Sequence, residues 1–204
     1  MALSLQQVSC ARGGLTLLEG LSFTVEPGQA LVLRGPNGIG KTTLLRTVAG
    51  LQPPVAGTIA PGDDQIAYAG HKDSVKATLT VEENLAFWAN VYGSTRLADA
   101  FEMFDLSSLR GRMGGQLSAG QTRRLGLARL VLSARPIWVL DEPTVSLDGF
   151  ARKQLMANLR AHLSQGGAAL LTSHVDLGLD ADELDLTPYK AVGIAASGFD
   201  EAIE

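Results

Sequence analysis

The residues from Gly35 to Thr43 constrain this chain more than any other stretch. They carry the pattern G-x-x-x-x-G-K-[ST] and consist of Gly35, Pro36, Asn37, Gly38, Ile39, Gly40, Lys41, Thr42 and Thr43. The apolar run 30–33 predicts a buried strand before the pattern, and residues 42–49 predict a helix after it. Glycines let a backbone wrap a polyphosphate with its N–H groups inward, and a helix N-terminus adds a positive dipole end. We therefore predict a phosphate-binding loop; the alternative is an ordinary glycine-rich turn between strand and helix.

Two side chains of this loop have expected roles in binding a nucleotide with β- and γ-phosphates. Lys41 is expected to reach the β- and γ-phosphates, and the hydroxyl of Thr42 is expected to ligate Mg²⁺. The remaining contacts to phosphate come from backbone N–H groups. A nucleoside triphosphate with Mg²⁺ is therefore the expected ligand.

The bulk properties narrow the class of protein. A chain of 204 residues can bury one core with a small appended subdomain. A net charge of −4 with scattered basic residues argues against a nucleic-acid-binding surface. The single cysteine, Cys10, excludes an internal disulfide and suits a reducing compartment. No apolar run approaches the about 18 residues of a membrane span, so we expect a soluble chain that reaches any membrane through a partner.

Alternating and helical patterns follow one another along the first half of the chain. Residues 3–8 and 20–25 alternate between apolar and polar, which predicts an antiparallel β layer. Residues 66–68 predict a short strand. Thr80 and Glu83 stand at capping-box spacing before an apolar helical face, and 97–104 predict a second helix. We expect a helical subdomain at about 78–132.

A second helix start stands out at residues 117–121. It reads Leu117, Ser118, Ala119, Gly120 and Gln121. Ser118 and Gln121 have capping-box spacing, and the exposed helix start is a candidate anion site. Capping alone would explain these two residues, so the functional interpretation depends on the motifs that follow.

Two carboxylates end the next apolar strand. Residues 137–140 predict a buried strand, and Asp141 and Glu142 follow it directly. Ligands of open α/β sheets lie at the carboxyl ends of the strands, where Asp141 can hold Mg²⁺ and Glu142 can activate water. A surface turn before Pro143 is the alternative. Residues 154–163 predict a helix and 168–172 another buried strand, which brings His174 to the same edge of the sheet.

These motifs, in this order, resemble the ATP-binding subunits of ABC transporters over nearly the whole chain. The resemblance implies a P-loop NTPase fold of the ABC ATPase type, an α/β core with an N-terminal antiparallel β layer and a helical subdomain, forming one domain over 1–204. It implies that two copies face head to tail, so that ATP on one phosphate loop is closed by Ser118, Ala119, Gly120 and Gln121 of the other. Glu142 would be the general base and His174 the sensor of the γ-phosphate.

Shorter stretches, at 10–23 and 68–71, resemble the ATPases of haem exporters in cytochrome c biogenesis. Three positions depart from the general family pattern. His71 stands where the family usually has a glutamine that senses Mg²⁺ and the membrane partner, which makes it, with Thr42 and Asp141, a candidate residue of the Mg²⁺ site. Ala119 replaces a glycine. No aromatic residue stands near Arg12, where the family stacks adenine, so Arg12 either stacks on the base or is an ordinary solvated arginine. His71 either makes the coupling between ATP hydrolysis and the membrane partner depend on pH between about 6 and 7, or it is a neutral imidazole that only forms hydrogen bonds.

We predict an ATPase that works as a homodimer on integral membrane transporter subunits, peripherally bound at the cytoplasmic face of the bacterial inner membrane. The chain would contact haem only indirectly, through those partners, and we expect no nucleic-acid partner. The alternative is an ATP-binding subunit that remodels a partner without transporting a substrate. A GTPase or small-molecule kinase lacks the 117–121 motif, and a DNA-repair cassette would need a long coiled coil that 51–116 cannot supply.

Overall fold

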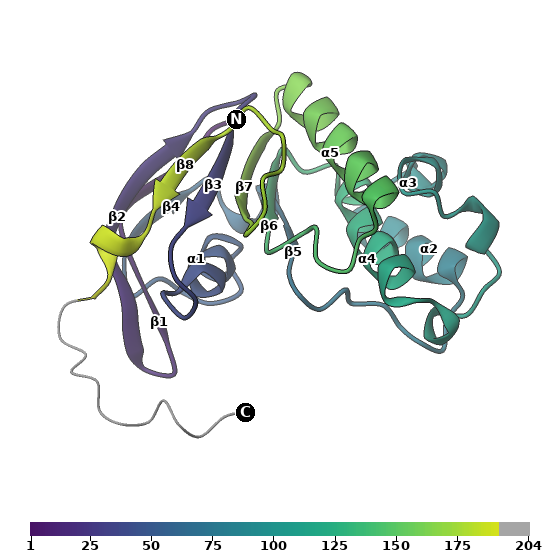
Figure 1. Ribbon diagram of the computed structural model, residues 1–204, viewed down its shortest axis with the longest axis horizontal. Helices are drawn as coiled ribbons and strands as arrows, with labels where there is room; N and C mark the ends of the chain where they lie inside the picture. Colours follow the sequence, from purple (N-terminus) through teal and green to yellow (C-terminus); the bar gives the residue numbers. More distant parts are fainter. Residues whose placement is uncertain (192–204) are drawn as a thin grey trace.

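The described part of the chain has two β-sheets, with one helix packed between them and the other helices gathered beyond the second sheet (Figure 1). A computed structural model gives the fold and describes residues 1–191. The expected domain over 1–204 therefore includes residues 192–204, which lie outside the described part. Within residues 1–191 no helix combines the length and the apolar character that a membrane crossing requires.

The N-terminal sheet is antiparallel, as predicted from the alternation. It contains β1 (Leu3–Arg12), β2 (Leu15–Val25) and β4 (Ala56–Ala60) in the order β2-β1-β4. The alternation in β1 is weak because its register shifts between Leu5 and Val8, where Gln7 has a φ of 51° and its backbone N–H donates to Ser22 Oγ. Strand β4 was not predicted from the sequence, since its short segment AGTIA is mostly exposed.

The second sheet is parallel throughout. Its strands are β3 (Ala30–Arg34), β5 (Ile66–Ala69), β6 (Ile137–Leu140), β7 (Ala168–Thr172) and β8 (Asp182–Asp185), in the order β5-β6-β7-β3-β8. Strand β8 was missed because its sequence, DELD, is acidic and largely exposed. In Figure 1 the parallel strands point toward the same lower edge, which places the segments that follow them together.

Five helices connect these strands. They are α1 (Lys41–Val48), α2 (Val81–Tyr92), α3 (Leu97–Met103), α4 (Ala119–Ser133) and α5 (Gly149–Ser164). Both predicted capping boxes are present, at Thr80 with Glu83 and at Ser118 with Gln121. Helix α5 begins five residues earlier than the predicted 154, because Asp148 Oδ1 accepts from the N–H of Ala151 and caps it there.

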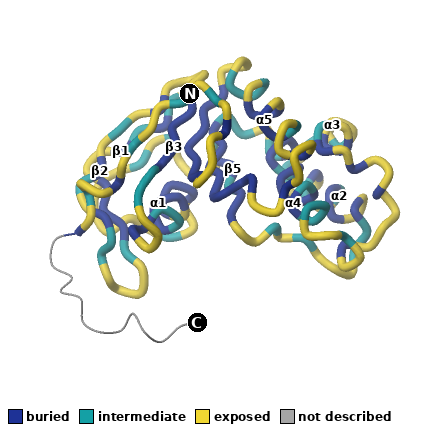
Figure 2. The backbone as a smooth tube through the Cα atoms, viewed as in Figure 1, coloured by how far each residue is buried: buried dark blue, intermediate teal, exposed yellow. Residues whose placement is uncertain are grey.

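The parallel sheet buries both of its faces, and alternate residues of each strand point to opposite sides. Leu31, Leu33, Val139 and Leu170 pack with α1 and the antiparallel sheet. The residues between them in sequence pack with the helices α2 to α5. Figure 2 shows the buried segments running through the middle of the molecule. The helical region at 81–133 thus shares one hydrophobic cluster with a face of the sheet.

Candidate functional site

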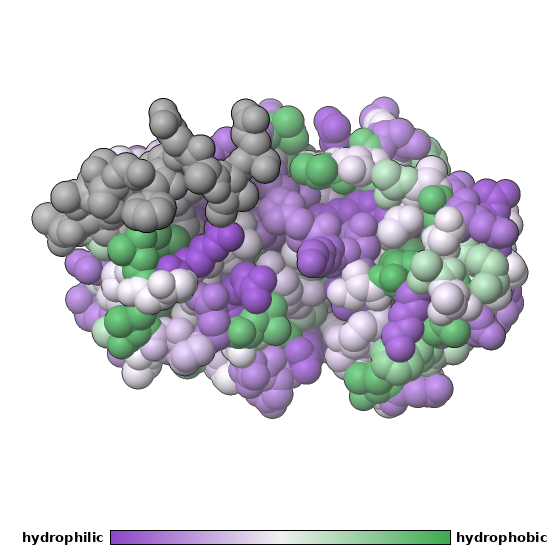
Figure 3. Space-filling model, turned by 90° about the horizontal axis from the view of Figure 1, so that it is seen from below, coloured by the Kyte–Doolittle hydropathy of each residue, from purple (hydrophilic) through white to green (hydrophobic). Residues whose placement is uncertain are grey.

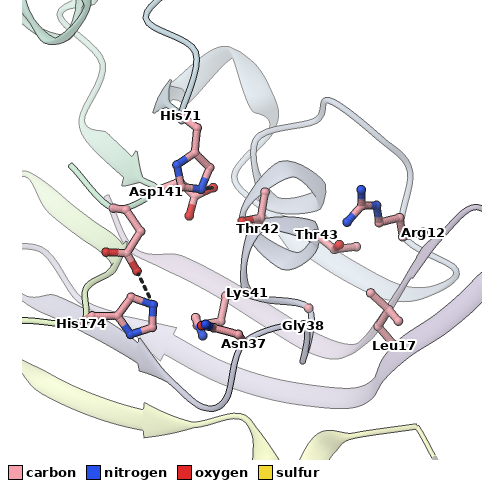
Figure 4. Close-up of a pocket in the computed structure, with 12 residues that line it drawn as sticks. Arg12, Leu17, Asn37, Gly38, Lys41, Thr42, Thr43, His71, Asp141 and His174 are labelled. Atoms are coloured by element: carbon pink, nitrogen blue, oxygen red, sulfur yellow. Dashed lines mark ion pairs between the residues drawn. The ribbon is translucent and has the colours of Figure 1, made fainter. Parts of the chain in front are cut away.

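A cavity of about 290 Å³ lies at the carboxyl edge of the parallel sheet and collects most of the predicted site residues. Its lining consists of Arg12, Leu17, Asn37, Gly38, Gly40, Lys41, Thr42, Thr43, His71, Asp141, Glu142 and His174. Figure 4 shows Lys41 and Thr42 in the middle, with His71, Asp141 and His174 on one side and Arg12 and Leu17 on the other. Viewed from below, the molecule carries hydrophilic side chains along its middle (Figure 3).

The phosphate-binding loop turns sharply into helix α1. Gly40 precedes the helix with a φ of 115°, and a Cβ there would meet Leu17 and Leu18 at 3.2 Å, so this position requires glycine. Lys41 Nζ donates to the carbonyl oxygens of Gly35 at 2.7 Å and Pro36 at 3.1 Å. The ammonium group therefore lies over the loop, where phosphate oxygens would be bound.

Ile39 and Thr43 anchor the loop in the fold. Ile39 is buried and packs toward Gly35, and the side chain of Thr43 is buried in the first turn of α1. Gly35, Pro36 and Ile39 do not line the cavity, unlike the other six residues of the predicted loop. They shape the loop from behind.

Asp141 and Glu142 meet the cavity at the end of β6. Asp141 is 1% exposed, and its Oδ1 accepts from Thr172 Oγ1 at 2.9 Å. The same threonine oxygen accepts from the N–H of Glu142 at 2.9 Å. Thr172, at the end of the neighbouring strand β7, thus holds the two acidic residues in register, a role that its apolar-run sequence context did not reveal.

One oxygen of each carboxylate is unusual because it is buried without a hydrogen-bond donor among the described residues. These oxygens are Asp141 Oδ2 and Glu142 Oε1. His71 Nε2 approaches the first to 3.4 Å and His174 Nε2 approaches the second to 3.3 Å, both within ion-pair distance but outside hydrogen-bond geometry. A buried carboxylate oxygen without a donor is suited to a cation or to a proton that is transferred.

These features fit a Mg²⁺ site in which the protein supplies only some of the ligands. Asp141 supplies a buried oxygen, and the Thr42 side chain lines the same cavity. Residues 1–191 contain no group of three or more His, Cys, Asp or Glu side chains that would hold a metal ion by themselves. Mg²⁺ usually keeps waters and phosphate oxygens among its ligands, so a site with few protein ligands matches its chemistry.

The backbone of Glu142 is held in an uncommon conformation. Its φ is 47°, in the left-handed region that non-glycine residues seldom adopt. Arg123 Nη2 donates to the carbonyl oxygens of Asp141 at 3.2 Å and Glu142 at 3.0 Å, and Arg123 Nη1 pairs with Asp73 at 2.8 Å. Arg123 is 4% exposed and comes from α4, so its contacts connect α4 to the acidic end of β6. Nothing in the sequence alone marked it among the other arginines of that helix.

The motif at 118–121 lies apart from this cavity. Ser118, Gly120 and Gln121 line a separate cavity of about 260 Å³ with Arg124, Ser146, Asp148 and Ala151. Ser118 Oγ accepts from the N–H of Gln121 at 3.3 Å, and Gln121 Oε1 accepts from the N–H of Ser118 at 3.0 Å, so both side chains cap α4. Ala119 is exposed in the first turn of α4, where its methyl group fits without strain.

Arg12 reaches the cavity from the hairpin between β1 and β2. It is exposed, and Leu17 lines the same end of the cavity. His71, whose side chain is 57% exposed, lines this cavity and also a second one beside α2 and α4. The structure thus brings every predicted nucleotide and metal residue to one edge, apart from the three that lie behind the loop.

Comparison with known proteins places this geometry in a family. Residues 18–145 match the family model described as ABC transporter. The chain is 60% identical over 191 residues to the "Cytochrome c biogenesis ATP-binding export protein CcmA" of Ruegeria pomeroyi, covering 94% of each chain. It is 59% identical over 192 residues to the protein of that name from Cereibacter sphaeroides, covering 94% of this chain and 91% of the relative. A solved structure from Pyrococcus furiosus, described as an ABC transporter ATP-binding protein, superposes with a TM-score of 0.82 at 28% identity and covers 94% of this chain and 100% of its own.

Proposed function

This chain belongs to the ABC transporter family as an ATP-hydrolysing, ATP-binding subunit, and on that premise we propose that its ATP hydrolysis drives a membrane complex of cytochrome c biogenesis. The relatives from Ruegeria pomeroyi and Cereibacter sphaeroides carry that process in their names and match this chain over almost its full length. The resemblance at 10–23 and 68–71 extends the proposal to the export or handling of haem. Haem would be bound by the membrane partners, since we assign the cavity described above to the nucleotide.

The observation that carries the proposal is the convergence of Lys41, Asp141, Glu142 and His174 on one cavity. Lys41 would bind the β- and γ-phosphates, with the loop N–H groups around them. Arg12 and Leu17 would contact the base at the far end of the cavity. Asp141 and Thr42 would hold Mg²⁺, which when bound neutralises charge on the phosphate oxygens.

Hydrolysis would begin when a water molecule between Glu142 and the γ-phosphate attacks phosphorus. Glu142 takes the proton of that water, a new P–O bond forms, and the bond from phosphorus to the β–γ bridging oxygen breaks. Inorganic phosphate and ADP leave. Lys41 stabilises the negative charge that spreads over the transferred group, and His174 contacts the γ-phosphate while its position is fixed beside Glu142.

Ser118, Ala119, Gly120 and Gln121 would act on the nucleotide of a second copy. Support comes from their separate cavity, which shares no lining residue with the phosphate-binding cavity of their own chain. A helix start that can bind an anion is completed only when another copy presents its phosphates. A homodimer with two composite sites follows from this arrangement.

The membrane partner would dock on the cavity beside His71. This cavity, of about 470 Å³, lies between α1, β5, α2 and α4 and is lined by the cations Arg46, Lys72, Arg129 and Arg135, by two tyrosines and by no carboxylate. None of these four cations forms an ion pair within residues 1–191. Charge complementarity therefore selects a carboxylate-bearing segment of the membrane subunit as the occupant.

Two residues connect the docking cavity with the nucleotide cavity. Thr42 and His71 line both cavities. Movement of the docked segment would therefore displace side chains at the Mg²⁺ and phosphate end of the nucleotide site. The chain would then lie peripherally at the cytoplasmic face of the bacterial inner membrane, where ATP is available.

The test uses the chain expressed with its own membrane partners. Tagged protein should copurify with integral membrane subunits, hydrolyse ATP to ADP and phosphate, and restore haem-stained c-type cytochromes to a strain that lacks it. The same strain carrying Glu142→Gln should make none. Full cytochrome maturation with a variant that hydrolyses no ATP would overturn the proposal.

A further inference from the structure

We propose that Arg34 is a positioning residue for His174, which it holds in place relative to the phosphate-binding loop. Arg34 is the last residue of β3 and directly precedes Gly35. His174 follows the neighbouring strand β7. The inference rests on the proposed role of His174 at the γ-phosphate and adds the group that fixes that histidine.

The guanidinium group of Arg34 reaches two segments at once. Nη1 donates to the backbone carbonyl oxygen of Ser173, the residue immediately before His174. Nη2 donates to Glu183 Oε1 on β8 at 2.6 Å, forming an ion pair. The N–H of Leu186, just after β8, donates to the carbonyl oxygen of Arg34 at 3.0 Å. Arg34 is therefore fixed by β8 on one side and holds the His174 turn on the other.

The turn that carries His174 is otherwise closed on itself. Ser173 Oγ donates to the carbonyl oxygen of Val175 at 2.8 Å and accepts from the N–H of Val175 at 3.1 Å. These bonds keep the turn compact but do not place it relative to the loop at 35–43. The hydrogen bond from Arg34 places the turn relative to the loop, because Arg34 is followed directly by Gly35, the first residue of the loop.

The position matters because His174 is 60% exposed in its side chain and yet must stay beside Glu142, whose Oε1 lies 3.3 Å from His174 Nε2. An exposed ring has few packing contacts to hold it, so the backbone under it must be fixed. Shifts of about 1 Å in a group at a reacting centre can cost roughly 100-fold in rate. A hydrogen bond to the preceding carbonyl is a direct way to prevent such a shift.

The exposure of the Arg34–Glu183 ion pair indicates that the pair positions other groups more than it stabilises the fold. The side chains of Arg34 and Glu183 are 32% and 56% exposed, and ion pairs at such exposure contribute little to folding. The single hydrogen bond that Arg34 donates to Glu183 lowers the pKa of Glu183 and raises the pKa of Arg34. The guanidinium group makes the two contacts through two different nitrogens of a rigid planar fork, whereas a lysine has a single nitrogen on a flexible stem.

The first experiment observes the histidine rings directly. The chain has three histidines, His71, His162 and His174, so long-range ¹H–¹⁵N spectra of the full-length protein give three sets of ring signals. Arg34→Gln should shift the His174 signals and leave those of His162, which stacks on Trp138 with ring centroids 4.0 Å apart. Glu183→Gln should produce a smaller shift of the same signals, since Arg34 keeps its bond to Ser173.

Arg160→Gln is the matched control. Arg160 Nη2 donates to the carbonyl oxygen of Gly178 at 2.6 Å, so this variant also removes an arginine bond to the connection between β7 and β8. It should leave the His174 signals in place. Unmoved His174 signals in Arg34→Gln, or equal shifts in all three histidines, would overturn the proposal.

Kinetics give the second readout. Arg34→Gln should lower kcat roughly tenfold while KM for ATP changes by less than about twofold, because the group acts on a contact made in the transition state. Arg34→Lys should recover only part of the loss. A parent protein without ATPase activity would defeat the proposed function, while the histidine spectra would still decide whether Arg34 positions His174.

Discussion

His174 Nε2 lies 3.3 Å from Oε1 of Glu142, and that oxygen has no hydrogen-bond donor within residues 1–191. Glu142 lines the cavity, and one oxygen of its carboxylate thus has no donor while a histidine stands beside it. Glu142 has a φ of 47°, a conformation maintained by Thr172 at its N–H and Arg123 at its carbonyl oxygen. Strain of this kind persists where surrounding contacts enforce it, and here those contacts aim one carboxylate oxygen.

Replacement of Glu142 by glutamine tests whether this carboxylate accepts the proton of the attacking water. The amide has nearly the same shape but accepts no proton, so kcat should fall at least about 100-fold while ATP affinity stays near that of the parent. Turnover and binding of a fluorescent ATP analogue on the same preparation measure both quantities. Hydrolysis at the parental rate would show that another group accepts the proton.

Lys41→Ala should weaken nucleotide binding, the step that precedes hydrolysis. Loss of a charge-assisted contact to phosphate costs about 1.5–3 kcal/mol, which weakens ATP binding by roughly 10- to 150-fold. Calorimetric titration with ATP gives the affinity, and turnover should fall further than binding because charge grows on the γ-phosphoryl group during transfer. Arg152→Ala, an exposed cation on α5, is the control and should bind ATP as the parent does. Equal affinities in the Lys41 variant and the parent would contradict the assignment of the loop.

Ser118→Arg tests the composite site. The bulky side chain would stand at the γ-phosphate of the partner copy, so hydrolysis should be lost while each monomer still binds ATP. Mixed dimers of Ser118→Arg with Lys41→Ala chains should recover activity, because one of the two composite sites then carries neither change. Normal hydrolysis by Ser118→Arg alone, or no recovery in the mixture, would exclude sites built across a dimer.

The docking cavity is tested by charge reversal. Arg46→Glu and Lys72→Glu place acids among cations that we expect to meet carboxylates, so the amount of membrane subunit that copurifies should fall about tenfold or more. Lys153→Glu makes the same charge change at an exposed position of α5 and should have no effect. Melting temperatures show whether each variant is folded. Unchanged copurification with both reversals would place the partner on another surface.

Cys10 gives a prediction about stability and pH. Burial raises the pKa of its thiol from 9.0 to about 11. Because the folded pKa lies above the unfolded one, the stabilising contribution is complete below pH 9 and is lost as the pH rises through 11, by roughly 2–3 kcal/mol. Unfolding by urea at pH 8 and pH 11 should therefore show a larger loss of stability in the parent than in Cys10→Ala. Parallel losses would mean that the thiol does not remain neutral in the fold.

The sequence by itself indicated which residues gather at the candidate site and several of the buried strands. The spacing from Gly35 to Thr43, the carboxylates after residues 137–140 and the histidine after 168–172 are local patterns, and parallel strands bring their carboxyl ends to one edge. The capping boxes at Thr80 and Ser118 were predictable for the same reason, because their bonds join residues three apart in sequence.

Only the tertiary structure decided which polar groups hold those residues in place. Thr172, Arg123 and Arg34 contact the site through bonds that span 18 to 139 residues of sequence, and no local period marks such partners. Strands β4 and β8 were missed because an exposed edge strand needs backbone pairing more than buried side chains, so their composition carries little signal. The separation of the Ser118 cavity from the phosphate cavity likewise depends on how α4 packs against the sheet, a long-range arrangement that adjacent residues do not encode.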